Sequence, residues 1–150
     1  MTSDARPLPR QPATARALIT DQDGRWLIVK DDRPHWYLPG GLIEHNEPPT
    51  VACEREVLEE TGLRIEAGRL LVVAWRAPTK PGRDARWSLI FDGGPADSTQ
   101  PLQLHDDEVR LARWVPPKNA LAALTPAIAQ RLVAWGVETN PATTYIQQTG

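Results

Sequence analysis

The chain has 150 residues, enough for one domain with a sizeable core but not for two comfortable ones. Its formal net charge of -2 and isoelectric point of about 5.9 exclude a global positive field of the kind that recruits nucleic acid polymers or acidic membranes. The single cysteine, Cys53, excludes an intrachain disulfide, and no apolar run has the length of a signal sequence or membrane span, so we expect a cytoplasmic protein.

The ends of the chain differ in composition from its centre. Residues 1–12 are rich in Pro and Arg, and residues 138–150 are polar and aperiodic, so we expect flexible tails around one domain over residues 13–137. At the start of the domain, the β-forming runs ARALIT and RWLIVK flank the turn signal DQDG and predict a hairpin. Further strands are predicted at residues 36–38, 42–44, 70–75, 85–91 and 109–115.

Two segments predict helices. Residues 49–61 precede Gly62, which suits a left-handed C-terminal cap, and residues 126–135 follow Thr125, a suitable N-cap. A shorter helix is expected around residues 119–124. Strands and helices are interspersed without regular alternation, which predicts an α+β domain with helices covering a mixed sheet.

The first predicted helix concentrates glutamates on one side. At about 100° per residue, Glu56, Glu59 and Glu60 project from one face. Val51 and Leu58 fall on the opposite face, where we expect the contact with the core. Like charges at these spacings destabilise a helix, and a bound divalent cation would remove that penalty. Oxygen ligands favour Mg²⁺ or Mn²⁺, which often complete their coordination with substrate phosphate; the alternative is a solvated acidic face.

The surrounding pattern favours the metal site. The chain fits G-x5-E-x7-R-E-U-x-E-E-x-G-U, where U is aliphatic, at Gly41, Glu47, Arg55, Glu56, Val57, Glu59, Glu60, Gly62 and Leu63. This pattern resembles the Nudix box and departs from it at no specified position. The preceding WYLPGG, the hairpin and the later EVRLARWVP extend the resemblance over residues 13–135. It implies the Nudix α/β/α sandwich, with a mixed sheet between helices.

The resemblance also implies an activity and residue roles. The expected enzyme is a Nudix pyrophosphohydrolase that cleaves a diphosphate linkage in a nucleoside diphosphate joined to another moiety. Divalent ions would be held by Gly40, through its carbonyl, and by Glu56, Glu59 and Glu60. Arg55 and Glu47 would position the carboxylates, while Gly41 and Gly62 would be structural. The candidate catalytic residues are Arg55, Glu56, Glu59 and Glu108.

Among these, Glu56 is the first choice of general base and Glu108 is the outside candidate. Glu108 belongs to the acidic run HDDEV, for which a solvated loop before a strand is the alternative interpretation.

Substrate contacts are predicted from cationic and aromatic side chains, namely Lys30, Trp36, Arg76 and Arg86. The two arginines flank the loop RAPTKPGRDAR, for which an ordinary solvated hairpin is the alternative. Pro78 follows Leu63 by fifteen residues, a spacing that resembles a marker of ADP-ribose hydrolysis. ADP-ribose therefore stands slightly above nucleoside triphosphates, nucleotide sugars and dinucleoside polyphosphates.

Two other classes of function are weighed against the hydrolase. A non-catalytic Nudix-like module that binds or senses a nucleotide would usually carry an eroded box, which this chain does not. An isomerase on the same fold would want an additional Cys or metal-binding His set. A homodimer is one candidate for the oligomeric state, and no nucleic acid polymer or membrane partner is expected.

Overall fold

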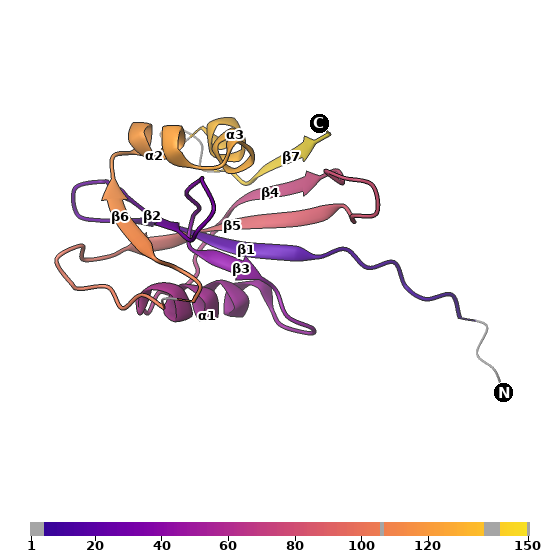
Figure 1. Ribbon diagram of the computed structural model, residues 1–150, viewed down its shortest axis with the longest axis horizontal. Coiled ribbons are helices and arrows are strands. Elements are labelled where there is room, and N and C mark those ends of the chain that lie inside the picture. Colours follow the sequence, from indigo (N-terminus) through magenta and orange to yellow (C-terminus); the bar gives the residue numbers. More distant parts are fainter. Residues whose placement is uncertain (1–4, 106, 137–141, 150) are drawn as a thin grey trace.

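The protein is described by a computed structural model that covers residues 5–105, 107–136 and 142–149 (Figure 1). Its centre is a mixed seven-stranded sheet in the order β6-β2-β1-β5-β4-β7, with β3 also paired to β1. The strands are β1 (Ala13–Thr20), β2 (Trp26–Lys30), β3 (Gly40–Leu42), β4 (Leu70–Arg76), β5 (Arg86–Pro95), β6 (Leu111–Val115) and β7 (Thr144–Gln148). The pairs β1–β5 and β4–β7 are parallel, and the remaining pairs are antiparallel.

Helices cover both faces of this sheet (Figure 1). Helix α1 (Pro49–Thr61) lies on one face, and α2 (Pro117–Ala123) and α3 (Pro126–Trp135) lie on the other. Each face has its own apolar core, one including Ile19 and Val57 beneath α1 and the other including Leu18 and Leu132 beneath α3. The predicted α/β/α sandwich with a mixed sheet is therefore confirmed. None of the helices in the described ranges has the length and apolarity that crossing a bilayer requires.

Alternation along β1 assigns its side chains to the two faces. Ala15, Ala17 and Ile19 belong to the core beneath α1, whereas Leu18 belongs to the core on the α3 side. Arg16 therefore points to the α3 side, in the middle of a largely buried strand. This orientation directs the Arg16 side chain into a cavity that strands and loops line together.

Several predicted bounds need correction. The helices over residues 49–61 and 126–135 are confirmed, but α2 begins earlier, at Pro117. The predicted strand at residues 36–38 is reduced to isolated bridges, Val29 with Tyr37 and Trp36 with Leu124. The strand expected at residues 42–44 is β3, which spans Gly40–Leu42; Gly40, without a Cβ, can lie against the backbone of β1.

The C-terminal segment is more ordered than expected. We predicted a flexible tail over residues 138–150, but Thr144–Gln148 form β7, which pairs with β4 and extends the sheet. Ile146 packs on the core beneath α3, and the Gln148 side chain accepts a hydrogen bond from Arg131 Nε at 2.8 Å. Residues 138–141 and 150 of the predicted tail, like residues 1–4 of the N-terminal one, lie outside the described residues.

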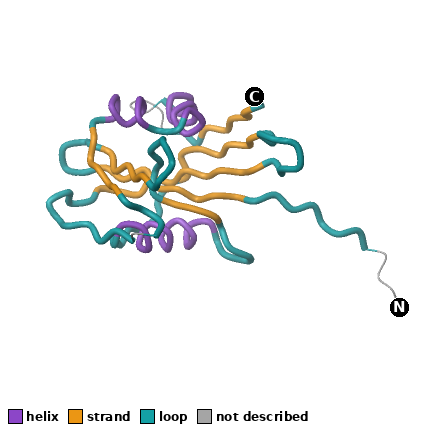
Figure 2. The backbone as a smooth tube through the Cα atoms, in the orientation of Figure 1, coloured by secondary structure: helices purple, strands orange, loops and turns teal. Residues whose placement is uncertain are grey.

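The connection between β5 and β6, residues 96–110, is long and irregular (Figure 2). It passes beside the C-terminal end of α1, where Gln103 N–H donates to Thr61 O at 2.9 Å. This path carries Asp107 and Glu108 to the vicinity of α1, although the two segments are about 50 residues apart in the sequence.

Candidate active site

Helix α1 holds the acidic residues between ends that its local sequence defines. Pro49 occupies the first turn, where its missing N–H costs no helical hydrogen bond. Gly62 ends the helix at a φ of 76°, and its N–H donates to Leu58 O at 2.9 Å. These two residues fix the length of the helix and therefore the turn on which each glutamate lies.

The face of α1 that packs on the sheet is not the predicted one. Val51 is 47% exposed and Leu58 is only half-buried, whereas the small residues Ala52, Cys53 and Thr61 are buried together with Val57. Small side chains make the contact because the helix lies close to β1 and β3. The buried face consequently adjoins the acidic face, and Glu60 lies within it.

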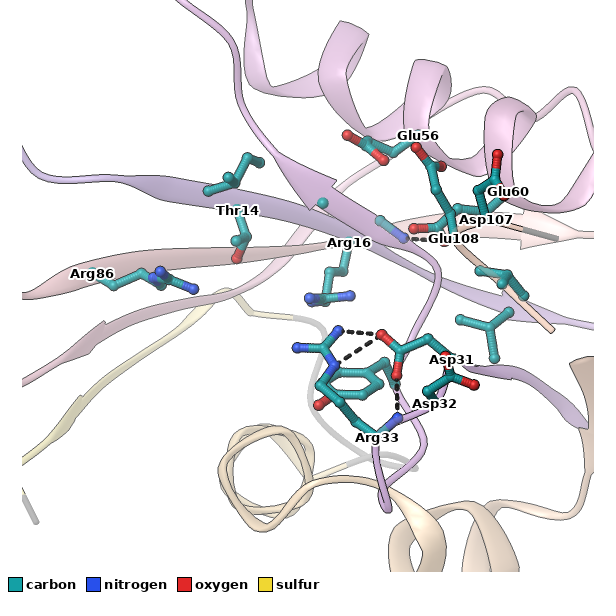
Figure 3. A pocket seen from close by; sticks show the side chains of 16 residues that line it. Thr14, Arg16, Asp31, Asp32, Arg33, Glu56, Glu60, Arg86, Asp107 and Glu108 are labelled. Carbon is teal, nitrogen blue, oxygen red and sulfur yellow. Dashed lines mark hydrogen bonds and ion pairs between the residues drawn. The ribbon is translucent and has the colours of Figure 1, made fainter. Parts of the chain in front are cut away.

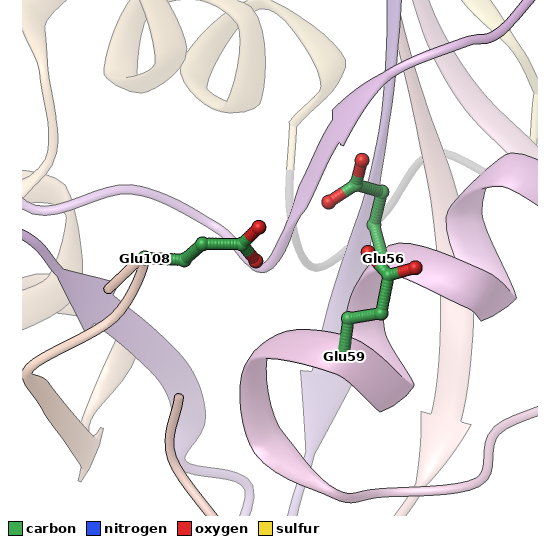
Figure 4. Close-up of side chains that lie close together, drawn as sticks. All are labelled: Glu56, Glu59 and Glu108. Atoms are coloured by element: carbon green, nitrogen blue, oxygen red, sulfur yellow. The ribbon is translucent and has the colours of Figure 1, made fainter. Parts of the chain in front are cut away.

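A carboxylate cluster forms beside α1 (Figure 4). One oxygen each of Glu56, Glu59 and Glu108 lies within 4.8 Å of the other two. Three carboxylate oxygens at this spacing suit a hard divalent cation, which would also relieve their mutual repulsion. The pKa of Glu56 is raised by its burial, an effect that Arg55 opposes and that Glu59 and Glu108 reinforce. The residues present therefore fit a Mg²⁺ or Mn²⁺ ion.

Glu60 lies apart from this cluster and is almost completely buried. Its Oε2 accepts a hydrogen bond from Gly40 N–H at 3.1 Å. Burial raises the pKa of Glu60 to about 8, against the opposing effects of the Gly40 hydrogen bond and of Arg16. The structure thus groups Glu108 with Glu56 and Glu59 and sets Glu60 deeper, between β3 and Arg16.

Arg55 forms hydrogen bonds to three glutamates of the motif. Its Nε and Nη2 bind both oxygens of Glu47, at 2.7 and 3.0 Å, and this pairing lowers the pKa of Glu47 to about 2. Its Nη1 donates to Glu56 Oε1 at 3.1 Å and to Glu59 Oε2 at 3.2 Å, while Nη2 reaches Leu42 O. One guanidinium therefore orients two carboxylates of the cluster and anchors them to the loop before α1.

The two glycines of β3 permit this close packing. A Cβ on Gly40 would lie 2.3 Å from Ala15 O, and the residue has a φ of 145°, so glycine is required there. A Cβ on Gly41 would lie 2.6 Å from the carboxyl carbon of Glu56. The missing side chain of Gly40 thus lets β3 lie against the backbone of β1, and that of Gly41 leaves the space that the Glu56 carboxylate occupies.

A cavity of about 510 Å³ opens beside the cluster (Figure 3). Its acidic side is formed by Glu56, Glu60, Asp107 and Glu108. Its other side carries the cations Arg16, Arg33 and Arg86 together with Asp31 and Asp32, and Asp31 pairs with Arg33. This lining provides carboxylates for a metal ion and guanidinium groups for an anion within one cavity.

Two of these cations lie over the aromatic ring of Tyr37. The guanidinium carbon of Arg33 lies 4.4 Å from the centre of the Tyr37 ring, and that of Arg16 lies 5.4 Å from it. Arg16 Nη1 donates to Leu38 O at 2.8 Å, while Arg33 pairs with Asp31 at 2.6 Å. We did not predict a role for Arg16. Its position in the otherwise apolar run ARALIT is the sequence signal that could have revealed it.

The other residues predicted to contact substrate are distributed unevenly. Arg86 lines the cavity, whereas Arg76 lines a separate hollow next to it. Lys30 ends β2 opposite Leu111 and does not line the cavity. Trp36 is also absent from the lining. It packs against the core near α2, where its backbone N–H donates to Ala123 O.

Comparison with known proteins gives consistent matches over most of the chain. A family model described as the NUDIX domain matches residues 10–136. A MutT-like protein of Streptomyces ambofaciens is 37% identical over 126 residues, which are 83% of this chain and 77% of that protein. The phosphatase NudJ of Escherichia coli K12 is 26% identical over 129 residues, which are 81% of this chain and 82% of that protein.

The fold has relatives among solved structures as well. The crystal structure of a MutT protein from Methanosarcina mazei Go1 aligns with a TM-score of 0.72 and 22% identity, covering 88% of this chain and 98% of that one.

Proposed function

The chain belongs to the Nudix hydrolase family, and we propose that it cleaves a diphosphate linkage in a nucleoside diphosphate joined to another moiety, with the aid of a divalent metal ion. One observation carries this proposal. The carboxylates of Glu56 and Glu108 belong both to the acidic cluster and to the wall of a cavity whose opposite side presents three arginines. A diphosphate could therefore lie between a metal held by carboxylates and the guanidinium groups that face it.

The metal would be held by Glu56, Glu59 and Glu108, joined by Glu60 and the Gly40 carbonyl that the family resemblance implies. When bound, Mg²⁺ or Mn²⁺ would neutralise phosphate oxygens and lower the pKa of an attacking water. Arg55 would keep Glu56 and Glu59 in place, since it donates to both carboxylates. We assign proton acceptance from the water to Glu56, with Glu108 as the alternative, because these two carboxylates also face the cavity.

The phosphate oxygens opposite the metal would be met by Arg16 and Arg33. Arg16 is half-buried and held by Leu38 O, and Arg33 is held by Asp31, so both guanidinium groups are oriented before substrate arrives. Such preorganised donors lose little freedom on binding and match phosphate geometry. ADP-ribose and other nucleoside diphosphate derivatives remain the substrate class that we propose; a cytoplasmic location and a homodimeric state stay predictions.

A panel of diphosphates tests the proposal. Phosphate or nucleotide release is measured for ADP-ribose, nucleotide sugars, nucleoside triphosphates and dinucleoside polyphosphates, with Mg²⁺, with Mn²⁺ and with a chelator. We expect turnover that requires the metal. Glu56→Gln should lower it at least about hundredfold, because the variant removes a carboxylate that contributes both charge and basicity.

The matched control is Glu66→Gln, an exposed carboxylate on the loop after α1, which should retain wild-type turnover. Circular dichroism establishes that both variants are folded. Failure of every diphosphate in the panel to be cleaved, combined with tight nucleotide binding, would replace the hydrolase by the non-catalytic binding module.

A further inference from the structure

A second hollow lies at the hairpin between β4 and β5. It has a volume of about 360 Å³, and its charged lining consists of Arg76, Lys80, Arg83, Arg86 and Asp84. We call it the hairpin pocket. Four cations thus surround one carboxylate in a space large enough for a phosphate group and part of the moiety that bears it.

The cations of the hairpin pocket lack partners of opposite charge. Within the described ranges, no ion pair within 4.0 Å involves any of the four, and no side-chain hydrogen bond does either. Four other arginines of the described residues do form ion pairs, for example Arg25 with Asp21, Arg33 with Asp31 and Arg110 with Asp32. The hairpin pocket differs in bringing four unpaired cations to one hollow. An anion bound in the hairpin pocket would supply the missing compensation.

The hairpin pocket continues from the candidate active site. Arg86 lines both the 510 Å³ cavity and the hairpin pocket, so the two spaces meet at this side chain. Arg86 pairs with Arg76 across β4 and β5, and it lies four residues before Ile90, the partner of Arg16 on β1. At about 3.3 Å per residue, the hairpin pocket begins roughly 13 Å along the sheet from Arg16.

The positive field on this face of the sheet also acts on α3. Arg131 is buried there, and its pKa is lowered to about 10, first by burial and then by Arg76, Arg16 and Arg86. Arg76, Arg16 and Arg86 thus act on one buried group from the face of the sheet that α3 covers.

We propose that the hairpin pocket binds a second anionic group of the substrate, separated from the scissile diphosphate and held by its four cations, Arg76, Lys80, Arg83 and Arg86. The inference rests on the proposed diphosphate hydrolase function. The preferred substrate then carries either a phosphate monoester on its nucleoside or a phosphate bridge longer than two units, since both place negative charge beyond the reacting phosphates. Selectivity for such compounds arises at Arg83 and Lys80, outside the cavity that holds the metal ligands.

Pairs of compounds that differ only in their additional phosphate test whether the hairpin pocket recognises that phosphate. The specificity constants, kcat/KM, are compared for NADPH against NADH, for coenzyme A against dephospho-coenzyme A, and for diadenosine tetraphosphate against the diphosphate, at about 0.15 M salt. The first two pairs differ by one ribose phosphate and the third by bridge length, so they distinguish the two sources of charge. We expect a preference of about tenfold for the more anionic member of at least one pair.

The hairpin variants then test the origin of that preference. Arg83→Gln should reduce the preference about threefold, and Lys80→Gln/Arg83→Gln should bring it close to one. Arg69→Gln, which removes an exposed arginine outside both spaces, should leave it unchanged. Equal kcat/KM within all three pairs for the wild type, or a preference that survives the double substitution, would overturn the inference.

A binding measurement keeps the result independent of turnover. Calorimetric titration of each pair into Glu56→Gln, with Mg²⁺ present and with or without Lys80→Gln/Arg83→Gln, reports the same preference as a ratio of dissociation constants. If no compound is cleaved by the wild type, the proposed function fails, while this ratio still decides whether the hairpin pocket binds the additional anion.

Discussion

Gly41 shows at the scale of one residue how the site depends on an absent side chain. Its backbone does not adopt a positive φ, so alanine can take its conformation, but the added Cβ would meet the Glu56 carboxyl at 2.6 Å. That carboxyl is the end of a flexible side chain and can move aside. For Gly41→Ala we therefore expect kcat/KM to fall about hundredfold while the free energy of unfolding changes by less than about 1 kcal/mol.

Gly24→Ala provides the reverse case for comparison. Gly24 has a φ of 74° with open space around it, so alanine there strains the backbone by about 1 kcal/mol but displaces no carboxylate. Urea unfolding and steady-state kinetics on the two variants separate the effects. Full activity in Gly41→Ala would show that the observed position of Glu56 is not needed for turnover.

The sequence predicts those residues of the site that lie close together along the chain, but not those that the fold brings together from distant segments. Glu56 and Glu59 were found because helical periodicity brings positions three apart to the same face. Glu108 was only an outside candidate, because it joins them through a loop that returns to α1 from β5. Arg16 was missed, since the pairing of β1 with β3 and β5, which no short pattern encodes, brings it opposite the carboxylates.

At the scale of an element, the β1–β2 hairpin is closed by Asp21. Its buried carboxylate accepts hydrogen bonds from Asp23 N at 2.9 Å, Arg25 N at 2.8 Å and Arg25 Nε at 2.7 Å. Burial works to raise the pKa of Asp21, but these bonds and one involving Ser98 outweigh it, so the pKa is lowered. Asp21→Asn should cost about 1–3 kcal/mol of stability at pH 7.

The pH dependence of that cost has a definite sign. A carboxyl whose pKa is lowered by folding stabilises the protein fully above its unfolded pKa of about 3.9, and the stabilisation is lost as the pH falls through the folded value. The difference in unfolding free energy between wild type and Asp21→Asn should thus be constant from pH 7 to 5 and shrink below about pH 4. A difference that stays constant down to acid pH would contradict this pH dependence. Asp23→Asn, which changes an exposed carboxylate, serves as the control.

Elements were predictable where their ends are marked in the sequence. The bounds of α1 and α3 follow from a proline in the first turn and a glycine at the C-cap, which act within a few residues. Strand β7 carries no such marks. Its sequence TYIQQ leaves Tyr145 exposed and contributes only Ile146 to the core, and its partner β4 lies about 70 residues earlier.

Across the whole molecule, the small net charge conceals a strong separation of charges. Carboxylates gather between α1 and the β5–β6 loop, and arginines gather across the sheet from β1 to β4. A net charge of -2 correctly argues against a field over the entire surface, but it carries no information on this division. The division arises only when the parallel pairing of β1 with β5 places Arg16 and Arg86 on one face.

The edge of the sheet also contributes to the stability of the whole domain. Deleting residues 143–150 removes Ile146 from the core, deprives buried Arg131 of its bond to Gln148 and exposes the edge of β4. These losses should cost about 4 kcal/mol and lower the melting temperature by roughly 8–16 °C, with more aggregation on heating. Gln147→Ala, which changes an exposed side chain of the same strand, should shift melting by less than about 2 °C. Scanning calorimetry on the three proteins makes the comparison, and a truncated chain that melts with the wild type would show that β7 adds nothing to the fold.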